Sequence, residues 1–112
     1  MSFTVRKDAT RGIIVIGVDG QLIVGNRHDL KSKVMEAVDA GDKRFVVDFA
    51  QTGYIDSSGL GVLVSLAKRV REVGGDLVLA NLNEDLRTLF ELTKLDTLFK
   101  ILPTVEDALS AF

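Results

Sequence analysis

The sequence predicts an α/β domain in which a mixed, mainly parallel β-sheet of about five strands is covered by about four helices. Its 112 residues suit one compact domain over residues 1–112, and 46% of them are hydrophobic, which is enough for one substantial core. Segments such as "FVVDF" and "LVLANL" are continuously apolar, which is typical of parallel strands buried on both faces. These segments alternate with stretches of helical periodicity, which gives the expected order β-β-α-β-α-β-α-β-α.

Five segments have the composition of strands. The first two flank a short turn near residues 9–12, which predicts an opening hairpin. The second, "GIIVIGVDG", is a nearly continuous β-branched run that predicts burial on both faces, with Gly17 and Gly20 interrupting it. The predicted strands are residues 3–7, 12–20, 44–50, 76–82 and 98–102.

Four segments have helical spacing together with start or stop signals. Asn26 is a good N-cap for the first, Asp29 completes a box-like start, and Gly41 ends the helix. The last follows Thr104 and has acids in its first turn, where the helix dipole favours them. The predicted helices, with their capping residues, are 26–41, 57–73, 83–93 and 104–112.

The composition argues against several classes of function. The net charge is −2 and no block of Lys and Arg occurs, so we expect no direct binding of nucleic acid, which depends on neutralising phosphates. The chain has no cysteine and therefore no disulfide, thiolate nucleophile or zinc–thiolate site. No apolar stretch is long enough to span a membrane, and no metal-ligand spacing occurs. We expect a cytoplasmic protein with no membrane association, metal or other cofactor.

The stretch "YIDSSGLGVL", residues 54–63, places two serines and an acid where the second predicted helix begins. On a helical wheel with about 100° per residue, one side of this helix faces the core and the other faces solvent. The expected core stripe is Gly59, Val62, Leu63, Leu66, Val70 and Val73. The expected outward side is Ser57, Leu60, Gly61, Val64, Lys68 and Arg71.

The outward side carries an unusual apolar pair. Leu60 and Val64 lie beside Ser57 on the wheel, which predicts a surface for a protein partner or for a weak homodimer. Gly61 lies on the same side, where glycine is about 1 kcal/mol less favourable than Ala in a helix. A glycine there allows another molecule to approach the backbone closely.

Ser57 is expected at the tip of this helix. The first N–H groups of a helix have no internal partner, and the helix dipole is positive at that end, so an anion is stabilised there. A phosphoserine would add a charge of about −1.5 to −2 and three acceptor oxygens. The fold would tolerate this modification, whereas an interface at Leu60 and Val64 would be disrupted by it.

Simpler and catalytic alternatives remain open at this point. Asp56, Ser57 and Ser58 are ordinary N-cap residues, so capping without further function explains them too. A catalytic serine needs a base within hydrogen-bond reach, and the one histidine, His28, is expected in the first turn of the preceding helix. The segment "DSSGLG" also lacks the Gly-Lys pair of a phosphate-binding loop, so it supports nucleotide binding only weakly.

A family resemblance adds to this reading. The segment "RFVVDFAQTGYIDSSGLGVLVSLAKRVREVGGDLVLANLNEDLRTLFELTKLDTLFKI" resembles the STAS domain of bacterial anti-sigma-factor antagonists. The resemblance covers nearly the whole chain and is strongest over residues 44–109. The motif "DSSGLG" between a strand and a helix is a specific signal of this family.

The resemblance implies a binding switch and not an enzyme. In that family the serine directly after the aspartate is phosphorylated by a partner that is both anti-sigma factor and serine kinase. A PP2C-type phosphatase removes the phosphate. The unphosphorylated antagonist binds the anti-sigma factor and frees the sigma factor for transcription. Carried onto this sequence, the phosphorylated residue is Ser57. With the wheel, the expected partner-binding residues are Asp56, Ser57, Ser58, Gly59, Leu60, Gly61 and Val64.

One segment departs from the family pattern. The family often has an acid at position 23 and a small residue at position 27, where this chain has Ile23 and Arg27. We expect the loop 21–28 to lie near Ser57, where Ile23 and Val24 would extend the partner-binding surface. The departure also favours an alternative, a STAS scaffold or nucleotide-sensing module without a phosphorylation cycle.

Overall fold

Two antiparallel strands begin the fold. The structure, a computed structural model, describes residues 2–112. In it, β1 (Ser2–Asp8) pairs along its whole length with β2 (Ile13–Leu22), as the predicted hairpin requires. Gly12 adopts a positive φ of 66° in the turn between them, a conformation that glycine reaches without strain.

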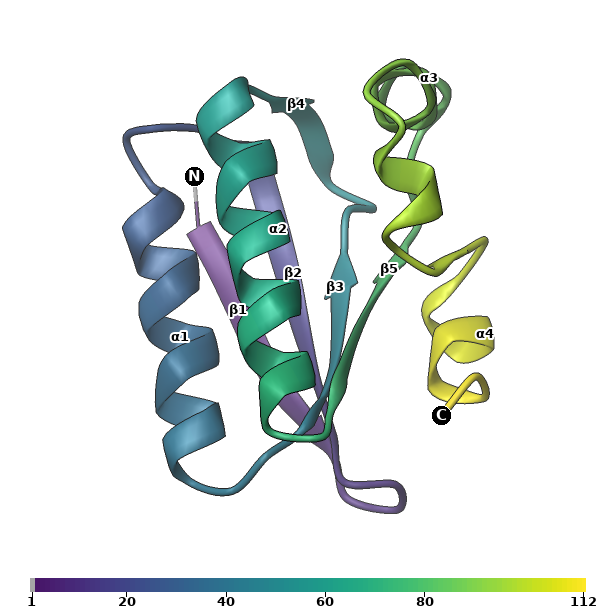
Figure 1. Cartoon of the computed structure of the whole chain (residues 1–112). Coiled ribbons are helices and arrows are strands. Elements are labelled where there is room, and N and C mark those ends of the chain that lie inside the picture. The colour runs from purple at the N-terminus through teal and green to yellow at the C-terminus, as the bar shows by residue number, and fades with distance from the viewer. Residues whose placement is uncertain (1) are drawn as a thin grey trace.

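The other strands run parallel to β2. β3 (Arg44–Asp48), β5 (Asp76–Ala80) and β6 (Ile101–Leu102) extend the sheet in the order β1-β2-β3-β5-β6. Figure 1 shows β1, β2, β3 and β5 next to one another in this order. β4 (Thr52–Ile55) pairs in parallel with the last residues of β2. The sheet is therefore mixed and mainly parallel, which confirms the predicted α/β class.

Helices cover both faces of this sheet. α1 (Arg27–Asp39) and α2 (Ser57–Glu72) lie side by side on one face (Figure 1). α4 (Val105–Leu109) packs on the opposite face, against β3, β5 and β6. α3 (Glu84–Leu92) and the 3-10 helix η1 (Leu95–Thr97) connect β5 to β6. Predicted caps are confirmed at α3 and α4, where Asn83 and Thr104 accept hydrogen bonds from backbone N–H groups.

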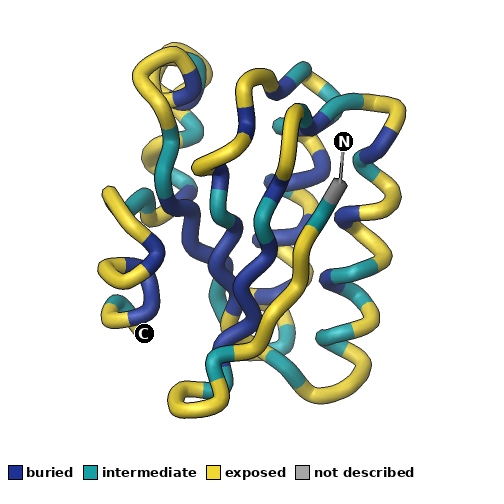
Figure 2. Tube along the Cα trace, turned by 180° about the vertical axis from the view of Figure 1, so that it is seen from behind, coloured by how far each residue is buried: buried dark blue, intermediate teal, exposed yellow. Residues whose placement is uncertain are grey.

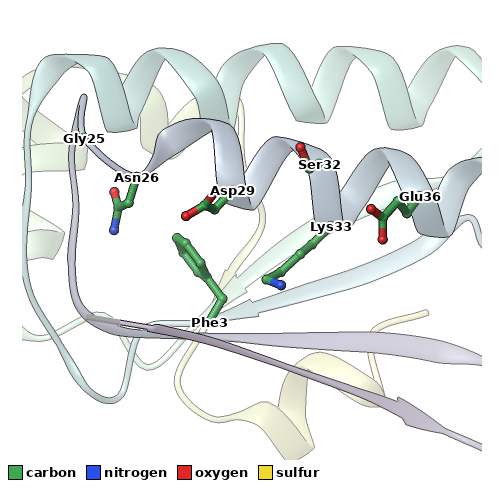
Figure 3. A pocket seen from close by; sticks show the side chains of 7 residues that line it. All are labelled: Phe3, Gly25, Asn26, Asp29, Ser32, Lys33 and Glu36. Carbon is green, nitrogen blue, oxygen red and sulfur yellow. The ribbon is translucent and has the colours of Figure 1, made fainter.

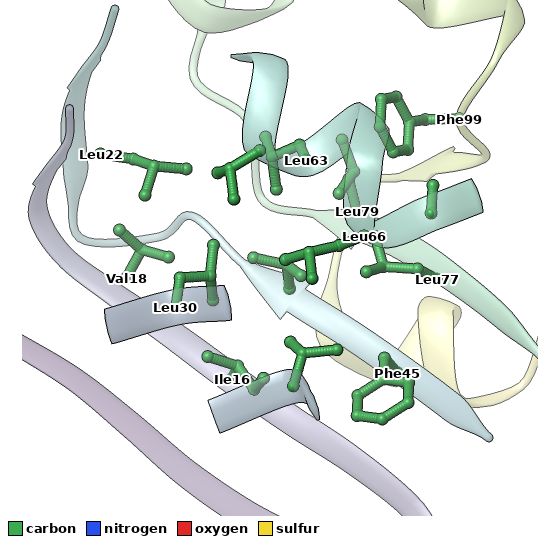
Figure 4. Packing of buried hydrophobic residues seen from close by; sticks show 14 of the residues in the cluster. Ile16, Val18, Leu22, Leu30, Phe45, Leu63, Leu66, Leu77, Leu79 and Phe99 are labelled. Carbon is green, nitrogen blue, oxygen red and sulfur yellow. The ribbon is translucent and has the colours of Figure 1, made fainter. Parts of the chain in front are cut away.

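The main core lies between the sheet and the pair α1 and α2. Ile16, Phe45 and Leu77 from the strands meet Leu30 and Leu63 from the helices, and all five are fully buried (Figure 4). Each such side chain contributes roughly 1.5–3 kcal/mol of transfer free energy relative to exposure. This packing fixes the position of α2 on the sheet.

β2 is buried on both faces, as its β-branched run predicts. Ile14 and Ile16 face the main core, whereas Ile13 and Val15 face a smaller cluster beneath α4. Figure 2 shows the central strands as a buried layer when the molecule is seen from behind. Because both faces of this strand are covered, side chains on both faces are apolar and the sequence does not alternate between apolar and polar residues.

The sheet contains one strand that the sequence analysis did not predict. β4 was expected to be part of the connection between β3 and α2, but it pairs with β2, which continues through Gly20 to Leu22 after an irregular register between Gly20 and Gln21. The Thr52 hydroxyl donates to the Val18 carbonyl oxygen at 2.6 Å and joins the two strands. The sheet therefore has six strands, and the predicted interruption of β2 at Gly17 and Gly20 is wrong.

Asn26 precedes α1 as predicted, but its side chain does not cap the helix. The Asn26 side-chain oxygen accepts from the Ile23 N–H at 2.8 Å, and its side-chain nitrogen donates to the Gln21 carbonyl at 2.7 Å. Asn26 is buried, and these two bonds hold the loop between β2 and α1 from inside. This loop is shorter than the expected 21–28, because β2 ends at Leu22 and α1 begins at Arg27. The predicted capping box at this helix is wrong because the amide is engaged within the loop.

Candidate functional site

The site is built where β4 ends and α2 begins. One oxygen of the Asp56 carboxylate accepts from the Gly59 N–H at 2.8 Å, which caps α2. The other oxygen accepts from the Val24 N–H at 3.1 Å. The Asp56 N–H itself donates to the Leu22 carbonyl at 3.1 Å. The loop between β2 and α1 is thus fixed beside the first turn of α2, close to Ser57 as expected.

Ser57 is the first residue of α2, and its side chain is exposed. Within the described residues, the backbone N–H groups of Ser57 and Ser58 donate to no acceptor. The sixteen-residue helix places the positive end of its dipole at this point. An anion on the Ser57 hydroxyl would therefore lie in a favourable field.

The structure corrects the wheel for the apolar pair. Leu60 and Val64 are half-buried and pack against the main core, instead of standing free on the outward side. That core includes Leu86 and Phe90 of α3, an element that a wheel of α2 alone does not contain. Only part of Leu60 and Val64 is available to a partner or to a second copy of the chain.

The two glycines of the motif have different environments. Gly59 is buried, and a Cβ there would overlap the carbonyl oxygen of Leu22 and approach Ile55. Its expected place on the partner-binding surface is therefore wrong, because Gly59 serves the close contact between α2 and β2. Gly61 is exposed, and a Cβ there would meet nothing within 4 Å. The space above Gly61 is open to another molecule.

The other residues that the sequence predicts to bind a partner lie at the same end of the molecule. Asp56 and Ser58 are half-buried, as is Ile23. Val24 is 59% exposed and is tied by its N–H to Asp56. This hydrogen bond holds Val24 beside the start of α2.

A hollow of about 510 Å³ lies beside Ser57, between the start of α2, β4 and α3. Tyr54, Leu60 and Leu89 contribute apolar surface to its lining, and Tyr54 is 58% exposed. Sequence reasoning missed Tyr54 and Leu89, since the first stands on an unpredicted strand and the second on another helix. The available signal was an aromatic residue two positions before the aspartate of the motif.

The charges around Ser57 are acidic. Asp56 and Asp85 line the same hollow, and no Lys or Arg of the described residues lines it. A phosphate on Ser57 would therefore add negative charge to a surface that already carries two carboxylates.

His28 does not pair with Ser57. It lines a separate groove between α1 and α2 with Gly61 and Ser65, and no hydrogen bond joins its ring to the Ser57 hydroxyl in the described part of the chain. Across residues 2–112, no group of three or more His, Cys, Asp or Glu side chains has the arrangement of a metal site. None of the described helices has the length and apolarity to cross a membrane.

Comparison with known proteins places this architecture in a family. The STAS domain family model matches residues 4–108. BtrV of Bordetella bronchiseptica is 32% identical over 105 residues, which cover 94% of this chain and 90% of that protein. The anti-sigma-B factor antagonist of Bacillus subtilis is 35% identical over 89 residues, 79% of this chain and 80% of that protein.

A solved structure agrees with the sequence matches. The crystal structure of TM1081 from Thermotoga maritima has a TM-score of 0.89 and 25% identity, and the match covers 97% of this chain and 92% of that one. The family model spans nearly the whole chain, and both of these relatives exceed 30% identity over most of their length. The chain therefore belongs to the STAS domain family of anti-sigma factor antagonists.

Proposed function

We propose that this protein is a partner switch in which the phosphorylation state of Ser57 controls binding to an anti-sigma factor. The unphosphorylated form binds an anti-sigma factor that is also a serine kinase, and this releases a sigma factor. Phosphorylation of Ser57 turns binding off, and a PP2C-type phosphatase restores it. The protein acts by binding and not by catalysis.

One observation carries the proposal. Ser57 is exposed at the positive end of a long helix, directly after the aspartate that caps that helix. The hydroxyl is therefore open to a kinase, and the fold gains or loses little when a phosphate is added. The Bacillus subtilis relative is an anti-sigma-B factor antagonist. We propose the same general role, antagonism of an anti-sigma factor, for this chain.

The electrostatics of the hollow supports the direction of the switch. Its lining combines apolar side chains, which suit a protein contact, with Asp56 and Asp85. A phosphate on Ser57 adds a charge of about −1.5 to −2 beside the hollow. A partner bound over the hollow would remove water from this charge, and that dehydration disfavours binding. The proposed contact surface comprises Ile23, Val24, Tyr54, Asp56, Ser57, Ser58, Leu60, Gly61 and Val64.

The test uses wild type, Ser57→Asp and Ser32→Asp as bait in lysate of the native host. Ser32 is exposed in the middle of α1, so Ser32→Asp is a matched control for the added charge. We expect wild type and Ser32→Asp to retain a serine kinase, and Ser57→Asp to retain at least about tenfold less of it, because burying an added carboxylate beside Asp56 and Asp85 costs several kcal/mol. Equal retention by Ser57→Asp would contradict the switch.

A second candidate, a scaffold or nucleotide-sensing module without a phosphorylation cycle, is favoured by Ile23, which precedes α1, and Arg27, which begins it. It predicts that the retained kinase, given ATP, transfers no phosphate to Ser57. The switch predicts one phosphate on Ser57 and none on the Ser57→Ala variant.

A further inference from the structure

We infer that the groove between α1 and α2 receives an acidic segment of the protein partner. This groove, of about 240 Å³, is lined by Arg27, His28, Lys31, Gly61, Val62 and Ser65. The inference rests on the proposed function for the identity of the partner and adds the chemistry of its contact.

The groove has an unbalanced positive charge. Arg27 and Lys31 carry cationic side chains one turn apart on α1, although the whole chain has a net charge of −2. Neither side chain forms an ion pair or hydrogen bond with any residue that the structure describes, and no carboxylate lines the groove. An acidic ligand would supply the missing countercharge.

Arg27 provides a second, independent observation. Its Nε is buried and has no hydrogen-bond acceptor among the described residues. Buried donors are normally satisfied, and one left without an acceptor is costly. Arg27 is half-buried and lines the groove, so a carboxylate bound there would add a charge-assisted hydrogen bond to a guanidinium that has no partner among the described residues.

The wall from α2 permits close approach. Gly61 is exposed with open space above it, so the backbone of a bound segment can lie against the helix. The buried Val62 forms the apolar floor beside Gly61. A peptide segment uses both features, whereas a small inorganic anion uses neither.

The groove is connected to the switch by helical spacing. Ser57, Gly61 and Ser65 are four residues apart and form one stripe along α2. One turn of helix separates Ser57 from Gly61, about 6 Å along the axis, which is less than the Debye length of about 8 Å at physiological salt. A phosphate on Ser57 would therefore repel an acidic segment from this groove.

The orientation of α1 supplies a matched control. Lys33 and Asp29 lie on the other side of this helix, in a hollow that faces Phe3 of β1 (Figure 3). Lys33→Gln removes the same charge as Lys31→Gln from the same helix, but outside the groove.

The experiment is a titration of the isotope-labelled, unphosphorylated protein, followed by two-dimensional NMR. The probes are a short amidated peptide of glutamates, the same peptide built from glutamine, and inorganic phosphate at equal ionic strength. We expect the glutamate peptide alone to shift the amide signals of the groove residues in a saturable way. Lys31→Gln should weaken this binding about threefold, and Arg27→Gln with Lys31→Gln about tenfold, whereas Lys33→Gln should leave it unchanged.

Other results overturn the inference. Equal shifts with the glutamine peptide would show that charge is not recognised, and tighter binding of phosphate would show a small-anion site. Equal weakening by Lys33→Gln and Lys31→Gln would show a general effect of net charge. This titration needs no kinase and is therefore independent of the test of Ser57 phosphorylation. The groove can fail to bind the glutamate peptide while Ser57 is phosphorylated, and it can bind the peptide while Ser57 is not.

Discussion

At the scale of single residues, the carboxylate of Asp56 joins two segments that lie 32 positions apart in the sequence. One oxygen caps α2 through the Gly59 N–H, and the other holds the Val24 N–H. The acid therefore has a structural role beside any role in binding. The sequence predicted the cap, because Asp before a helix is a local signal, but the bond to Val24 depends on the pairing of β2 with β4.

Asp56 variants test this double role. We expect Asp56→Ala to lower the free energy of unfolding by about 1–2 kcal/mol, because a cap and a second acceptor are lost. Asp56→Asn should cost about half as much, since the amide keeps one acceptor oxygen for Gly59. Urea denaturation measures both, with Asp19→Ala as an exposed control expected to change stability by less than about 0.5 kcal/mol. If Asp56→Ala were as stable as wild type, the two hydrogen bonds accepted by Asp56 would contribute nothing to the free energy of unfolding.

The two glycines of the motif give opposite predictions. Gly61→Ala should raise the free energy of unfolding by up to about 1 kcal/mol, because the Cβ meets open space and alanine favours the helix. Gly59→Ala should lower it by about 1–3 kcal/mol, because the Cβ would displace Leu22 and Ile55. Thermal unfolding of Gly61→Ala and Gly59→Ala measures both effects. Equal changes in stability would contradict the claim that the two glycines have different environments.

At the scale of elements, β4 and α2 together present the serine. The helix was predictable from its periodicity and its cap, and the core stripe held for Gly59, Val62, Leu63, Leu66 and Val70, with Val73 half-buried. β4 was not predictable, because "TGYI" is short and places Gly53 and Tyr54 in exposed positions. Its stability comes from pairing with β2, a non-local interaction that no local pattern records.

The dipole of α2 gives a prediction at this scale. Ser57→Asp should raise the free energy of unfolding by about 0.5 kcal/mol, because an acid at the first helical position faces the positive end. Ser32→Asp should lower it by about 0.2–0.5 kcal/mol, because Glu36 lies one turn further along α1. Urea denaturation at low salt compares the two. A large loss in Ser57→Asp would mean that a phosphate there disturbs the fold itself.

At the scale of the whole molecule, the sheet brings distant segments to one end. The ends of β2 and β4, the start of α2 and the helix α3 meet around Ser57. The order of strands and helices was predictable from apolar runs and start signals. The half-burial of Leu60 and Val64 was not, because both pack against a core that several elements build, and the positions of those elements follow from the complete topology.

The most direct test of the central claim is phosphosite mapping by mass spectrometry on the protein purified from its own host, before and after treatment with a PP2C-type phosphatase. The account predicts a single phosphate, located on Ser57, which the phosphatase removes and which the Ser57→Ala variant lacks. A phosphate on another residue, or none before treatment, would contradict it.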